Sequence, residues 1–194
     1  GMLVFSKKSL VSLMRKPWLT KGVIPLNVYS VESIYYHPEV QKLAAEKLSA
    51  VVGGDLPKKL EKANSNAIKA IRENANHLSA RIAEKAARAQ VFSLLPKKGE
   101  VAAGGKRIAE IDFTKFAQDE EARIEALLDA SDFVGLLQRY PIRESPALNA
   151  IAKALSFASC AQYEAAVRNL LVRDSEAVES VRTLLGPLPA DLIA

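Results

Sequence analysis

The side chains that could carry catalysis or bind a metal ion are few and widely spaced. An acidic run lies at 119–121, but consecutive carboxylates on a helix point in different directions, so we expect a solvated face. His77 follows Glu73 by one helical turn, and two ligands do not complete a metal site. Cys160 has no histidine near it in sequence, so we expect a small helix residue and not a nucleophile. We therefore predict that the chain is not an enzyme and has no catalytic residue, metal site or cofactor.

The stretch PKKGEVAAGGKR at 96–107 has one feature of a phosphate-binding loop, because Gly99 and Gly104 have the separation of such a loop. Gly105 stands where the loop requires a lysine, and Arg107 replaces the required hydroxyl. We therefore expect residues 97–107 to form a flexible linker and not a nucleotide site.

The charges are distributed unevenly along the chain. Residues 1–107 contain 19 basic and 8 acidic residues, whereas residues 108–194 contain 8 and 14. A basic face attracts phosphate backbones, but an acidic surface in the same molecule or dimer would neutralise it equally well. Both alternatives are open. For the first, we predict non-specific nucleic-acid contacts from Lys7, Lys8, Arg15, Lys16, Lys62, Lys69 and Arg72.

The stretch from Pro57 to Pro96 has no internal glycine or proline, and its apolar residues recur at helical spacing. A single helix of roughly 38 residues would span roughly 57 Å, more than one compact domain of this size. We therefore expect either a break near one of its asparagines or pairing with a second chain as a homodimer. Those asparagines are Asn64, Asn66, Asn74 and Asn76. Asp55 can cap the start of the helix, and the Leu95-Pro96 step ends it.

Residues 22–37 are rich in β-branched and aromatic residues, which favour a strand or extended segment. The sequence PLNVYSVESIYYHPEV at 25–40 resembles the late segment of Toprim-type nuclease regions in OLD-like ATPases. The counterparts of the family's Glu-Asn pair are Glu32 and Ser33, and the next helix opens at Pro38. No aspartate precedes Asp55 and no Asp-x-Asp occurs. The resemblance therefore implies the C-terminal part of such a region, inactive alone, with an ATPase or nuclease as a partner protein.

The acidic part of the chain, residues 108–194, is predicted to form a series of short helices, including one at 113–129. The stretch 148–167 resembles the helix-turn-helix of AraC-like proteins, on the positions Ile151, Ala152, Leu155, Phe157, Ser159 and Tyr163. Ser156 stands where that motif usually has glycine. The second helix would offer mainly Gln162, Glu164 and Arg168, whereas a helix that reads a DNA groove needs basic support for phosphates. Two packed helices joined by a tight turn are the favoured interpretation.

These patterns predict a mainly α protein, a helical bundle organised around one long helix with a short extended segment near the N-terminus. We expect four regions: a basic and aromatic segment at 2–54, the long helix at 55–96, the linker at 97–107 and an acidic helical domain at 108–194. No run approaches the roughly eighteen apolar residues of a membrane span, and one cysteine fits a reducing compartment. We therefore expect a cytoplasmic protein with no membrane span.

The favoured function is that of a non-catalytic helical interaction module associated with nucleic acid. The alternative is a structural helical protein that dimerises through its long helix and has no nucleic-acid role.

Overall fold

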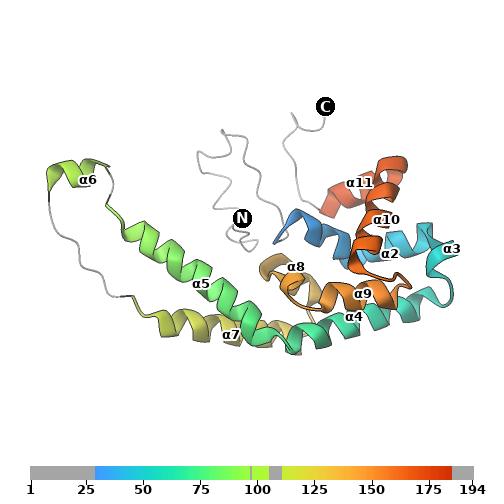
Figure 1. The fold of residues 1–194 in the computed structure, drawn as a ribbon, viewed down its shortest axis with the longest axis horizontal. Coiled ribbons are helices and arrows are strands. Elements are labelled where there is room, and N and C mark those ends of the chain that lie inside the picture. Colours follow the sequence, from blue (N-terminus) through green and yellow to red (C-terminus); the bar gives the residue numbers. More distant parts are fainter. Residues whose placement is uncertain (1–28, 97, 105–110, 185–194) are drawn as a thin grey trace.

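The computed structural model describes residues 29–96, 98–104 and 111–184, and every regular element in these ranges is a helix. The mainly α fold is therefore confirmed. Figure 1 shows a body of packed helices from which a two-helix arm projects. The arm consists of α5 (Ala75–Leu94) and α7 (Phe113–Asp129), with α6 (Lys98–Ala103) at its far end. The body contains η2 (Val31–Tyr36), α2 (Pro38–Lys47), α3 (Ser49–Val52), α4 (Leu56–Arg72), α8 (Phe133–Arg139), η3 (Ile142–Glu144), α9 (Ala147–Ala154), α10 (Cys160–Arg173) and α11 (Ser175–Leu184).

The predicted helical stretch at 55–96 is broken, which is one of the two alternatives left open, because the chain forms α4 and α5 with a break at Glu73 and Asn74. The side-chain amide of Asn74 donates a hydrogen bond to the carbonyl oxygen of Ala70 at 2.8 Å. Such local bonding competes with continuation of the helix, and Asn74 is one of the four positions at which a break was expected. The predicted ends are confirmed: Asp55 Oδ1 accepts from the backbone N–H of Lys58, and α5 stops before Leu95.

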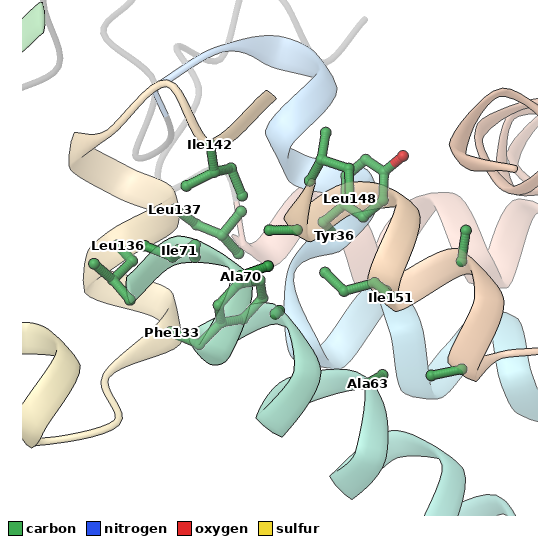
Figure 2. Close-up of a cluster of buried hydrophobic side chains, with 14 of the residues drawn as sticks. Tyr36, Ala63, Ala70, Ile71, Phe133, Leu136, Leu137, Ile142, Leu148 and Ile151 are labelled. Atoms are coloured by element: carbon green, nitrogen blue, oxygen red, sulfur yellow. The ribbon is translucent and has the colours of Figure 1, made fainter. Parts of the chain in front are cut away.

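Most of the apolar stripe of this stretch is covered within the chain. α4 packs along α9, and α5 packs along α7. Ala67, Ile71 and Leu78 are fully buried, and Figure 2 shows Ala63 and Ile71 of α4 in one cluster with residues of α8 and α9. Small alanine side chains let α9 approach α4 closely. The buried part of the stripe is therefore core of one chain, whereas its last residues, Ala86 and Ala89, are half-buried and exposed, respectively.

The expected extended segment is also wrong where the structure describes it. Residues 31–36 form the 3₁₀ helix η2, while residues 22–28 lie outside the described ranges. The described residues offer no strand with which this segment could pair. Instead, Tyr36 is fully buried, with its ring centroid 5.2 Å from that of Tyr163. Packing of the aromatic side chains thus outweighs their β propensity.

Two further predictions concern the linker and the helix pair of the acidic half. Part of the predicted linker is helical, because residues 98–103 form α6, whereas residues 97 and 105–107 lie outside the described ranges. The packed pair with a tight turn is confirmed as α9 and α10. In the turn, Ser156 has a φ of 70°, the left-handed conformation that favours glycine and explains why similar motifs carry glycine there.

Candidate functional site

One buried carboxylate belongs to the acidic run that the sequence predicted to be solvated. Glu120 on α7 is only 5% exposed, so that prediction is wrong for this residue. Arg139 donates from Nε to Glu120 Oε2 at 2.9 Å, and the hydroxyl of Tyr140 donates to the same oxygen at 3.2 Å. Arg139 Nη2 also donates to Glu120 Oε1. Burial of this carboxylate is tolerated because a charged partner and a hydroxyl satisfy it.

A second buried carboxylate has the same type of partners. Glu164 on α10 is 8% exposed. The hydroxyl of Tyr36 donates to its Oε1 at 2.8 Å, and Arg143 Nη2 donates to the same oxygen at 2.6 Å. Glu164 therefore points into the protein and cannot serve on the exposed face of a DNA-reading helix. Gln162 instead lies in the first turn of α10, where its Oε1 accepts from the backbone N–H of Ala158 at 2.7 Å, and Ser159 caps the helix.

The tyrosines and arginines of these clusters are held in their ordinary ionisation states. Burial, followed by the hydrogen bond to Glu164, raises the pKa of Tyr36. Burial and the charge of Glu120 likewise raise the pKa of Tyr140. Burial alone would lower the pKa of Arg139, but its hydrogen bond to Glu120 raises that pKa. Each cluster thus contains donors bonded to an acceptor, an arrangement suited to holding helices together and not to proton transfer.

Residues 139–144 join these clusters to the arm. Glu144, at the end of this segment, accepts from His77 Nε2 and from Arg81 Nε, both at 3.1 Å. Partial burial alone would raise the pKa of Glu144, but the hydrogen bonds from Arg81 and His77 outweigh it and hold this pKa below its ordinary value. The segment therefore contacts α7 through Arg139, α10 through Arg143 and α5 through Glu144. We call residues 139–144 the connector.

The predicted nucleic-acid residues are only partly placed by the structure. Lys7, Lys8, Arg15 and Lys16 lie outside the described ranges. Lys62 and Lys69 are exposed on α4, and neither makes an ion pair within the described residues. Arg72 instead pairs with α7: its Nη1 lies 3.3 Å from Glu125 Oε2, and its Nη2 lies 3.0 Å from Asp129 Oδ1. Arg72 is therefore engaged at the junction of α4 with the arm.

An apolar patch at the far end of the arm was not predicted. Five of the seven exposed large apolar side chains among the described residues lie there, with Phe92 69% and Phe113 60% exposed. We call them the arm-end patch: Val91, Phe92, Leu95, Val101 and Phe113. A groove of about 340 Å³ adjoins it, with Ala83, Ala87, Phe113 and Phe116 among its lining residues. The helical spacing of apolar residues at 113–129 places Phe113 and Phe116 on the apolar side of that helix. This spacing does not show that the buried core stops before it reaches Phe113.

Within the described ranges, no group of three or more histidine, cysteine or acidic side chains is arranged to hold a metal ion. No helix in those ranges is long and apolar enough to cross a membrane. Comparison with protein-family models, with curated proteins and with solved structures finds no match to the chain. The Toprim resemblance stays a prediction, with Glu32 exposed and Ser33 buried in η2.

The Glu120 cluster gives a test of the connector. Arg139→Ala leaves a buried carboxylate without its main charged partner, so we expect the free energy of unfolding to fall by about 2 to 4 kcal/mol. The matched control is Arg123→Ala, because Arg123 is half exposed and its Nη1 lies 3.6 Å from the same carboxylate. This control should cost less than about 1 kcal/mol. Urea unfolding followed by circular dichroism measures both, and equal losses would show that burial of the ion pair does not matter.

Proposed function

We propose that this chain is a non-catalytic helical interaction module that assembles with a second copy of itself through the arm-end patch. The observation that carries the proposal is the concentration of exposed apolar side chains at the end of the arm that lies farthest from the body. Exposed clusters of this kind are typical of protein contact surfaces. Most of the long apolar stripe first considered for dimerisation is buried in the chain, so the contact is assigned to the arm end instead.

The size of the patch suits a dimer. Its five side chains expose roughly 600 Å² in total, judged from the surface of such side chains, and a stable interface takes roughly 800 Å² from each partner. The polar residues at the edge of the patch can supply the remainder. The exposed apolar surface is therefore at the upper end of what monomers expose, and it supplies most of the area of a specific contact.

The shape of the arm end supports a second copy as the partner. Ala83 and Ala87 lie in the groove, where small side chains leave space. Phe92, the most exposed member of the arm-end patch, lies on the same helix just beyond the groove. One arm thus carries both a cavity and a side chain large enough to enter one. In a two-fold symmetric dimer, Phe92 of each copy would enter the groove of the other copy, so that both grooves are filled and both Phe92 side chains are buried.

A second candidate function is non-specific nucleic-acid binding, and the exposure of Lys62 and Lys69 on α4 favours it. The two lysines are seven residues apart and so lie on one face of the helix, roughly 10 Å from each other along its axis. Together with the basic residues of 1–16, they would form a phosphate-binding surface whose affinity falls steeply with salt. An ATPase or nuclease partner, implied by the Toprim resemblance, belongs to this same proposal.

The self-association proposal is tested by replacing the most exposed aromatic residue of the patch. Phe92→Ser removes the side chain that enters the groove, so we expect the dimer dissociation constant to rise roughly thirtyfold, as for a central interface residue. Sedimentation equilibrium over a range of protein concentrations measures this constant. Val172→Ser is the matched control, because Val172 is 80% exposed on α10 and outside the arm.

The control variant should dimerise like the native chain. A native chain that stays monomeric at every concentration, or two variants that behave alike, would contradict the assignment of the arm end.

The nucleic-acid proposal is tested by reversing two charges on α4. Lys62→Glu with Lys69→Glu should weaken retention of a short DNA duplex at low salt without unfolding the protein, because both side chains are exposed. Lys153→Glu with Arg168→Glu changes the net charge equally at exposed positions on α9 and α10. Co-sedimentation at low and high salt compares the two. Unchanged retention in the first variant would remove α4 from the contact, and equal loss in both would indicate only an effect of net charge.

A further inference from the structure

A groove of about 550 Å³ lies between α2 and α11, on the body and apart from the arm. Val40 and Val181 form its buried apolar floor, and the partly buried Leu43 and Leu184 extend it. The edges of the groove are polar. They consist of Glu39, Lys42, Glu46, Glu176, Glu179, Ser180 and Thr183.

The edges of this groove are predominantly acidic, with four glutamates and one lysine. Glu176 is paired with Lys47 at 3.0 Å and Glu179 with Arg182 at 3.1 Å. Within the described residues, Glu39 and Glu46 make no ion pair. An apolar floor between acidic edges fits an amphipathic helix that carries apolar residues on one side and basic residues beside them.

We propose that residues 2–16 of the same chain occupy this groove. Their sequence places Leu3, Leu10, Leu13 and Met14 at helical spacing, with Lys7 and Lys8 between them and Arg15 and Lys16 directly after them. The first 30 residues contain no acidic residue. This segment therefore supplies both the apolar residues for the floor and the positive charges for the edges.

The chain is long enough for this contact to form within one molecule. Tyr29 is the first residue that the structure describes, and its backbone N–H donates to the carbonyl oxygen of Leu137 at 3.2 Å. From there η2 leads directly into α2, whose Glu39 is the first residue to line the groove. Residues 17–28 can span up to roughly 40 Å when extended. The distance from Tyr29 to the groove is the length of η2 and the first turn of α2, about half of that 40 Å. Residues 2–16 can therefore reach the groove.

The alternative occupant is the segment 185–194, because it follows in sequence on Leu184, which lines the groove. It contains apolar residues, but its one charged side chain is Asp191, which the glutamates of the groove repel. Charge complementarity therefore favours residues 2–16. The contact would also account for the uneven charge of the chain, because the basic N-terminal segment would face acids of its own molecule. A polyanion would then compete with the groove for the same lysines.

The test uses the full chain with the photoreactive residue p-benzoylphenylalanine in place of Lys42, an exposed position at the edge of the groove and distant in sequence from both termini. After irradiation, mass spectrometry identifies the peptide that is cross-linked to position 42. We expect an adduct to residues 2–16 at the mass of one chain. An adduct to 185–194, an adduct at the mass of two chains, or no adduct would overturn the proposal.

Charge reversal provides the matched controls for this experiment. Glu39→Lys with Glu46→Lys should lower the yield of the adduct roughly tenfold, and adding Lys7→Glu and Lys8→Glu should restore it. Glu61→Lys with Glu73→Lys makes the same change of charge at exposed positions outside the groove, on α4 and at its C-terminal cap, and should leave the yield unchanged. Equal yields in all three variants would show that charge does not select the occupant. None of these substitutions touches the arm end, so the outcome is independent of dimerisation.

Discussion

The pairing of two buried glutamates with the connector is the constraint on which the arrangement of the helices depends. Arg139 and Tyr140 hold Glu120 on α7, while Arg143 and Tyr36 hold Glu164 on α10. A buried carboxylate without its partner is costly. The Glu120 cluster therefore forms only when α7 of the arm is correctly placed on the body, and the Glu164 cluster only when α10 and η2 are correctly placed on the connector. Such pairs favour one arrangement over its alternatives more than they add to net stability.

The position of the arm follows from this constraint. The connector contacts α7 and α5, and Arg72 at the end of α4 holds the last turns of α7 through Glu125 and Asp129. These contacts fix the base of the arm, where α5 and α7 lie beside the body. The far end has no neighbouring helix of the body (Figure 1), so its apolar side chains are left exposed. A surface held out in this way is suited to meeting another molecule.

Local signals predicted much of the fold. Asp55 and Pro96 defined the outer ends of the central stretch, 113–129 was predicted with its exact bounds, and Asn74 was among the expected breaks. Contacts between distant residues were not predictable from these signals. Glu120 looked solvated because its partner Arg139 is nineteen residues away, and Tyr36 looked like a strand residue because its partner Glu164 is 128 residues away. The arm-end patch was missed because helical periodicity marks an apolar face without showing what covers it.

We propose that the body holds the arm in place and that a second copy binds at the arm end. Hydrogen exchange of the native chain, followed by mass spectrometry at several protein concentrations, tests both parts in one measurement. We expect amides of 88–95 and 113–117 to gain protection as the concentration rises, while those of the connector keep the same protection throughout. If the concentration dependence appears in α4 or α9 instead, or if no segment changes, the arm end is not where a second copy binds.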